Sequence, residues 1–147
     1  MLQRSFILLI SVFITVQLSA QTNEKIEVIK HNHVALHVKD IATSTKFYKE
    51  VMGLEPIAVP DSLKAIRSWF KLGTDQQIHL LAGRTKKVHN SRTGSHFALV
   101  VQSMIETENF LISKKIKYHK QVRFDGAVQI YIADPDGYLI ELNDVKK

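Results

Sequence analysis

The sequence contains no cysteine, and this absence removes several classes of chemistry at once. Without a thiol the chain cannot form a disulfide, bind a metal through thiolates, use a cysteine nucleophile or carry a lipid on a lipobox cysteine. Any transition metal bound by this protein must therefore rest on His, Asp and Glu side chains. The chain has 7 histidines and 14 acidic residues to supply them.

Long apolar runs are also absent. The main one covers residues 6–16, well short of the roughly 20 residues that span a bilayer. Arg4 precedes this run and small residues leading to Ala20 follow it, an order typical of a secretory signal peptide. We expect cleavage after Ala20, a mature domain over residues 21–147, a periplasmic or secreted location, and no membrane association after cleavage.

The charge balance is basic but dispersed. The net charge of +6 falls to +5 once residues 1–20 are removed, because that segment holds Arg4 and no acid. The lysine clusters carry no interleaved aromatic residues that could stack on bases, so we predict no nucleic-acid partner. An apolar content of 45% is enough to bury the core of one compact domain.

From residue 29 onward the pattern of strands and helices occurs twice. Each half predicts a strand, a helix and three further strands, with Asp40 and the capping box of Ser103 and Glu106 opening the two helices. The sequence DPDG predicts a hairpin turn before the last strand. Module one covers about residues 29–83, the connector residues 84–94, and module two about residues 95–144.

The two halves can be aligned. NHVALHV lies over SHFALVV at an offset of 63, which places His33 over His96; at an offset of 62, IHLL lies over IELN and His79 over Glu141. Such a repeat predicts two similar units related by a pseudo-twofold axis. The predicted fold class is α+β, with two βαβββ modules in one chain forming a curved mixed sheet around a cleft.

These four repeated positions form the candidate metal site. Side chains alternate along a strand, so His33, His79, His96 and Glu141 lie on the sheet faces turned away from the helices. If those faces curve around one cleft, three imidazoles and a carboxylate converge, a set that suits one divalent transition metal such as Zn, Ni, Co, Fe or Mn. Burying Glu141 among apolar neighbours without a cation would be costly, which favours the same conclusion.

Further residues are candidates for binding a small-molecule substrate, either by sharing these faces or by carrying charge that a substrate carboxylate would pair with. They are His37, Arg67, Trp69, Arg123, Gln129 and Tyr131. The remaining histidines, His31, His89 and His119, are interpreted as ordinary exposed or hydrogen-bonded residues.

Four segments resemble the vicinal oxygen chelate superfamily, which includes glyoxalase I, bleomycin- and fosfomycin-resistance proteins and extradiol dioxygenases. They are NHVALHVKDIATSTKFYKEVMGLEPI, QIHLLAG, SHFALVV and YIADPDGYLIELND, and the similarity covers residues 29–144. The resemblance implies paired βαβββ modules around a divalent metal. In glyoxalase I the ligands come from the first and fourth strands of each module, which implies His33, His79, His96 and Glu141 here, with His79 standing where bacterial glyoxalase I has glutamate.

The resemblance implies a metal-dependent, glyoxalase I-like lyase or isomerase that acts by proton transfer on a small, metal-chelating, oxygenated substrate. Glu141 would then be the catalytic residue, a ligand that also accepts the proton. An iron-dependent extradiol-type dioxygenase using His33, His96 and Glu141, and a non-catalytic binding protein of the bleomycin-resistance type, are the alternatives. Whether one chain or a homodimer completes the site is left open.

Overall fold

The computed structural model describes residues 25–145. The expected signal peptide, residues 1–20, lies outside the described residues, so its cleavage and the location of the protein stay predictions. The chain divides into a leading unit, residues 1–30, and a compact unit, residues 31–147. The described part of the leading unit, residues 25–30, is exposed and forms neither helix nor strand. No helix in residues 25–145 is both long and apolar enough to cross a membrane.

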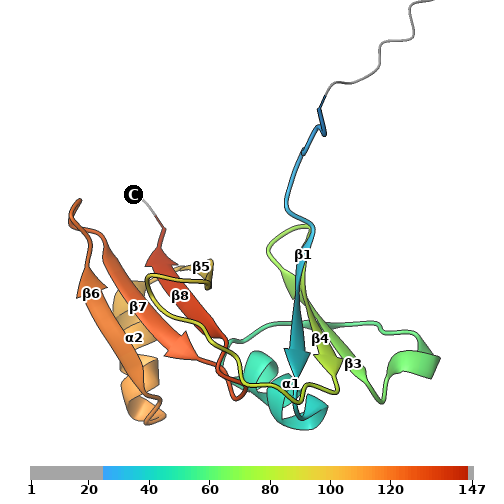
Figure 1. The fold of residues 1–147 in the computed structure, drawn as a ribbon. Helices are drawn as coiled ribbons and strands as arrows, with labels where there is room; N and C mark the ends of the chain where they lie inside the picture. The colour runs from blue at the N-terminus through green and yellow to red at the C-terminus, as the bar shows by residue number, and fades with distance from the viewer. Residues whose placement is uncertain (1–24, 146–147) are drawn as a thin grey trace, which may run out of the picture. The chain divides into compact units, whose positions relative to one another are not determined.

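Module one forms a four-stranded sheet with the strand order β1-β4-β3-β2 (Figure 1). Strands β1 and β4 are parallel, and the other neighbours are antiparallel. Helix α1 begins after Asp40, whose carboxylate accepts a hydrogen bond from the backbone N–H of Thr43 at 2.7 Å. The elements are β1 (His33–Val38), α1 (Ile41–Glu50), β2 (Pro56–Ile57), the 3-10 turn η1 (Asp61–Leu63), β3 (Arg67–Leu72) and β4 (Gln76–Ala82).

Module two repeats this topology with the strand order β5-β8-β7-β6 and a parallel β5–β8 pair. Its elements are β5 (Phe97–Val101), α2 (Met104–Ser113), β6 (Tyr118–Val122), β7 (Val128–Ala133) and β8 (Leu139–Asp144). The predicted α+β class with two βαβββ modules is confirmed. The strands hydrogen-bond into two separate four-stranded sheets, however, and not into one closed sheet.

The core fixes which face of each sheet is open. In module one, alternate residues such as Leu36, Ile78 and Leu80 are fully or almost fully buried together with Tyr48 of α1. In module two the corresponding buried residues are Ile130, Ile132, Ile140 and Leu142. Burying a large apolar side chain contributes about 1.5–3 kcal/mol, so a register slip that exposed these residues is excluded. The intervening residues therefore lie on the opposite face, which we call the open face of each sheet.

The DPDG turn between β7 and β8 also fastens the two modules together. The carboxylate of Asp136 accepts hydrogen bonds from the Ser44 hydroxyl and the Lys39 backbone N–H, both at 2.7 Å, and pairs with Arg84 at 2.6 Å. The side chain of Asp136 is only 3% exposed. The buried hydroxyl of Tyr48 donates to Asp134 at 2.9 Å. The sequence predicted a turn here, and its two carboxylates additionally tie module two to α1 and to the connector.

Replacing Asp136 by asparagine should lower the free energy of unfolding by about 3 kcal/mol at neutral pH, because the largely buried Arg84 guanidinium loses its partner. Burial works to raise the pKa of Asp136, but Arg84, Ser44 and the Lys39 N–H outweigh it and hold the pKa below the ordinary 3.8. Because the pKa of this carboxyl is lower in the folded than in the unfolded chain, its ionisation stabilises the folded state at pH values above the unfolded-state pKa. This stabilisation is lost as the pH falls through the folded-state pKa. Urea denaturation at neutral pH and at about pH 3 measures both effects.

The wild-type advantage over the Asp136→Asn variant should therefore shrink on acidification. Asp61→Asn is the matched control, since Asp61 pairs with Lys64 on the surface and its side chain is 92% exposed. That control should change stability by less than about 1 kcal/mol. An Asp136→Asn penalty of the same size at both pH values would contradict the assigned role of the carboxylate.

Candidate functional site

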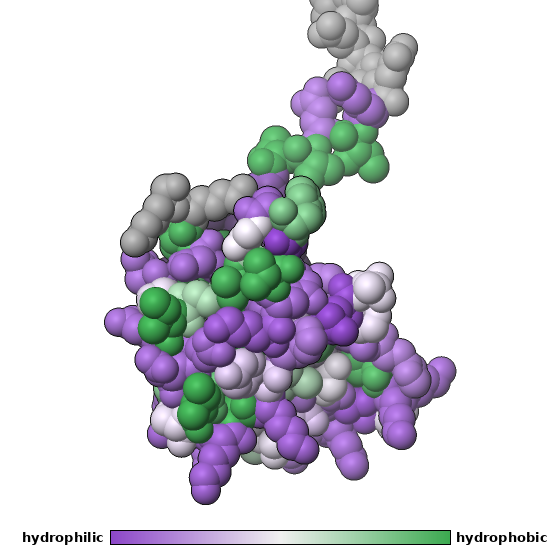
Figure 2. All heavy atoms as spheres, turned by 90° about the vertical axis from the view of Figure 1, so that its left-hand side faces the viewer, coloured by the Kyte–Doolittle hydropathy of each residue, from purple (hydrophilic) through white to green (hydrophobic). Residues whose placement is uncertain are grey.

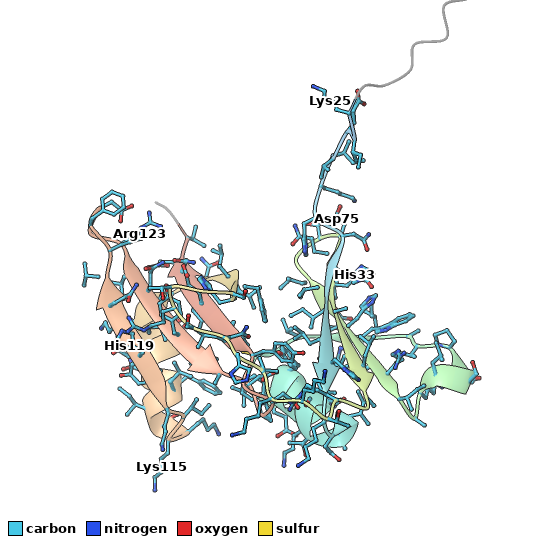
Figure 3. All side chains as sticks on the ribbon, in the orientation of Figure 1. Lys25, His33, Asp75, Lys115, His119 and Arg123 are labelled. Atoms are coloured by element: carbon cyan, nitrogen blue, oxygen red, sulfur yellow. The ribbon has the colours of Figure 1, made fainter. Side chains whose placement is uncertain are left out.

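Three flat rings stack on the open face of module one. The imidazoles of His33 and His79 have ring centroids 4.3 Å apart and planes 17° apart. The indole of Trp69 stacks on the other side of His79, with centroids 4.7 Å apart and planes 20° apart. The register explains this arrangement, because His79 lies opposite Trp69 on β3 and opposite Ala35 on β1, one step along the same face from His33. Figure 3 labels His33 at the start of β1.

Each of these two imidazoles has one ring nitrogen engaged. Nδ1 of His33 lies 2.6 Å from the amide oxygen of Asn32, and Nε2 of His79 lies 2.6 Å from the amide oxygen of Gln77. An amide oxygen only accepts, so the engaged nitrogen carries a hydrogen, and whenever such a ring is neutral its opposite nitrogen has a free lone pair. Burial, and then the nearby charge of His33, lower the pKa of His79. The neutral imidazole that results is the form that binds a metal.

His96 and Glu141 meet on the open face of module two. Nε2 of His96 lies 2.8 Å from Oε2 of Glu141, and Nδ1 of His96 lies 2.9 Å from the carbonyl oxygen of Gly94. Both ring nitrogens thus face acceptors, and the carbonyl requires a hydrogen on Nδ1. The Nε2 lone pair can meet the carboxylate only through a proton or another cation. A divalent metal in that position would replace the proton, so this donor set fits a metal.

Glu141 is only 8% exposed, and its carboxylate is surrounded by hydrogen-bond donors. The Tyr131 hydroxyl donates to Oε2 at 2.8 Å, the Asn143 amide donates to Oε1 at 2.8 Å, and the Gln129 amide donates to the same Oε1. Burial works to raise the pKa of Glu141, but Asn143, Tyr131, His96 and Gln129 together hold it below the ordinary value. Glu141 is therefore an ionised carboxylate in a fixed orientation.

The two pairs occupy equivalent places in the repeat. His79 lies between Ala35 on β1 and Trp69 on β3, and Glu141 lies between Ala98 on β5 and Tyr131 on β7. We call the pair His33 and His79 the first half-site, and the pair His96 and Glu141 the second half-site. Each module therefore supplies two candidate ligands on its open face, as the alignment of the halves predicted.

The structure brings the predicted ligands together in pairs. Within residues 25–145, no group of three or more His, Asp or Glu side chains is placed to hold one metal ion. The four-ligand set drawn from the sequence thus stays a prediction that needs the two half-sites to meet.

The predicted substrate residues fall into two groups. Trp69 stacks on a candidate ligand, and Gln129 and Tyr131 hydrogen-bond to one. The other three have different partners. His37 contacts Tyr138 and the carbonyl oxygen of Ala82, Arg67 donates to the carbonyl oxygen of Ile66, and Arg123 forms an ion pair with Asp125. Figure 3 labels Arg123 just beyond the end of β6, and His119 within that strand.

Sequence reasoning missed three residues of the polar network. Asn143 shares the strand face of Glu141 by the period-two rule, but no role in the site was assigned to it. Gln121 lies opposite Gln129 in the β6–β7 pair and donates to the Gln129 amide oxygen at 2.9 Å. Arg92 of the connector donates to Gln121 at 2.8 Å. The connector has no periodicity, so nothing in the sequence pointed to Arg92.

Comparisons with known proteins give matches over most of the chain. A family model described as the Glyoxalase/Bleomycin resistance protein/Dioxygenase superfamily matches residues 30–142. The chain is 30% identical over 119 residues to an Arabidopsis thaliana protein called Glyoxylase I 4, with 76% of this chain and 68% of that protein covered.

Solved structures show the same fold. A glyoxalase family protein from Bacillus anthracis superposes with a TM-score of 0.67 at 28% identity, covering 83% of this chain and 99% of that one. Lactoylglutathione lyase from Agrobacterium tumefaciens has a TM-score of 0.63 at 21% identity, covering 82% of this chain and 96% of that one. The second likeness shows the fold alone.

Replacing Tyr131 by phenylalanine should lower the free energy of unfolding by about 2 kcal/mol, because the buried Glu141 carboxylate loses a donor. Tyr118→Phe is the matched control, since its hydroxyl also donates to a carboxylate, that of Glu108, at 2.9 Å but at a more exposed position. The control should cost less than about 1 kcal/mol. If chemical denaturation shows the same loss in free energy of unfolding for both variants, the Tyr131 hydrogen bond stabilises the fold no more than the exposed Tyr118 bond does.

Proposed function

Because this chain belongs to the glyoxalase/bleomycin resistance protein/dioxygenase superfamily, we propose that it is a metal-dependent enzyme related to glyoxalase I. It would act by proton transfer on a small oxygenated substrate that chelates the metal. The observation that carries this proposal is the contact between His96 and the ionised, donor-surrounded Glu141. An ionised carboxylate oriented toward an imidazole nitrogen is the arrangement expected of two ligands of one metal ion, and a binding protein without a metal does not require it. The expected signal peptide supports a periplasmic or secreted location.

The candidate ligands would have distinct roles. His33, His79, His96 and Glu141 would hold one divalent ion, which when bound polarises a chelated oxygen and makes the neighbouring C–H more acidic. Glu141 would accept the proton, and Tyr131, with the amides that touch the same carboxylate, would keep it oriented. Glu141 is the one carboxylate among the four candidate ligands, because the other three are imidazoles. The proposed proton transfer therefore uses Glu141 as its single base.

We further propose that a second copy of the chain completes the site. Closing the two half-sites within one chain would require the modules to move, and the buried contacts of Asp134 with Tyr48 and of Asp136 with Arg84 resist this movement. In a twofold dimer, if one surface of the first copy contacts a second surface of its partner, the same contact forms again with the two copies exchanged. The first half-site of each copy would thereby meet the second half-site of its partner, and the dimer would hold two ions.

Elemental analysis of natively purified protein tests the metal. We expect about one ion of nickel, zinc, cobalt, iron or manganese per chain. The single variants His96→Ala and Glu141→Gln should weaken metal affinity by about 100-fold, while the control His119→Ala, on the edge strand β6, should not. Metal-free wild-type protein that still binds small ligands would support the bleomycin-resistance type of binder.

The metal-loaded protein should then isomerise a hemithioacetal of an α-ketoaldehyde without consuming oxygen, and Glu141→Gln should abolish the turnover. Iron as the bound metal, together with oxygen uptake in the presence of a catechol, would favour the extradiol dioxygenase instead.

Mixing two inactive variants tests the second copy. The variant with His33→Gln and His79→Gln keeps only the second half-site, and the variant with His96→Gln and Glu141→Gln keeps only the first. Alone, neither should bind metal tightly. After co-refolding in equal amounts, random pairing restores one intact site in each mixed dimer, or about one ion per four chains. If the mixture binds no more metal than its components, the site is completed within one chain.

A further inference from the structure

The connector places an arginine over the open face of module two. Three contacts position this segment: Arg84 pairs with Asp136, the Asn90 amide oxygen accepts from the Leu139 backbone N–H at 3.2 Å, and Arg92 donates from Nη1 to Gln121 at 2.8 Å. Arg92 therefore occupies a defined position although it is exposed. Its guanidinium uses Nη1 on Gln121, which leaves the other edge of the fork for a further acceptor.

Arg92 is connected to the proposed catalytic carboxylate through a polar chain. The Gln121 amide that receives Arg92 donates to Gln129 at 2.9 Å and reaches the Tyr131 hydroxyl at 3.5 Å. Both of those side chains hydrogen-bond to Glu141. A second arginine, Arg123, directly follows β6.

The charges of these two arginines are balanced differently. Arg123 forms an ion pair with Asp125, which cancels most of its charge. Within residues 25–145 no ion pair involves Arg92. A guanidinium that is held in position, lacks a carboxylate partner among these residues and has a free edge matches the planar, two-oxygen geometry of a carboxylate.

We propose, on the basis of the proposed function, that Arg92 binds a carboxylate at the far end of the substrate. The side chains of Gln121 and Tyr131 lie between Arg92 and Glu141, so this carboxylate must be separated by a short carbon chain from the oxygens that chelate the metal. The substrate class is accordingly a small organic acid with chelating oxygens at one end and a carboxylate at the other.

Comparing the affinities of two α-keto acids tests the role of Arg92 separately from the proposed metal chelation. Both α-ketoglutarate and α-ketocaproate offer the same chelating α-keto acid group, but only α-ketoglutarate has a distal carboxylate. Isothermal titration calorimetry on the Ni²⁺-loaded protein should give about tenfold tighter binding of α-ketoglutarate, the scale of one charge-assisted pair. The Arg92→Gln variant should lose this preference while its affinity for α-ketocaproate stays within about twofold, and Arg92→Lys should retain part of it.

Lys87→Gln is the matched control, because it removes a positive charge from the same connector and should keep the full preference. The inference is overturned if Arg92→Gln keeps the preference, or if it weakens both acids equally, as a merely structural residue would. A wild-type protein that binds both acids equally overturns this inference alone. A wild-type protein that binds neither overturns the proposed chelation as well.

Discussion

The structure depends on the carboxylates of one turn. Asp134 and Asp136 are held by Tyr48, Ser44 and Arg84, which belong to the other module and to the connector. These contacts are largely buried, and breaking one partner of a buried ion pair costs several kcal/mol. The turn therefore sets the relation between the two sheets. The contacts of Asp134 and Asp136, more than the candidate ligands themselves, therefore decide whether the two half-sites can meet within one chain.

Period-two alternation predicted the sheet face on which each candidate ligand lies. The buried positions Ile78 and Leu80 place His79 on the open face, and Ile140 and Leu142 do the same for Glu141. The alignment of the two halves additionally predicts that His79 and Glu141 occupy equivalent places in their sheets. The strand pairing agrees, since His79 lies opposite Ala35 and Glu141 lies opposite Ala98. Alternation tells which side of a sheet a side chain takes. It carries no information on the distance between two sheets, so the meeting of the four ligands could not be derived from it.

The surface shows a second limit of sequence patterns. Figure 2 shows separate hydrophobic spots within a mainly hydrophilic face of the molecule. Phe124, at the tip of the β6–β7 hairpin, is 98% exposed although it is a large aromatic residue, because β6 ends at Val122 and Phe124 lies in the turn. Arg67 and Arg123 were assigned to the substrate by charge alone. In the structure Arg67 donates to a backbone carbonyl and Arg123 pairs with Asp125, partners that charge alone did not predict.

Equivalent positions in the repeat have diverged into unlike halves. The first half-site offers stacked rings, His33, His79 and Trp69, and no carboxylate. The second offers the Glu141 carboxylate within a network of amides and a phenol that extends to Arg92. A cleft built from one of each would have a flat aromatic wall and a polar, charged wall. A substrate bound between them would be oriented by its own polarity, so the duplicated fold could select the direction of binding as well as the metal.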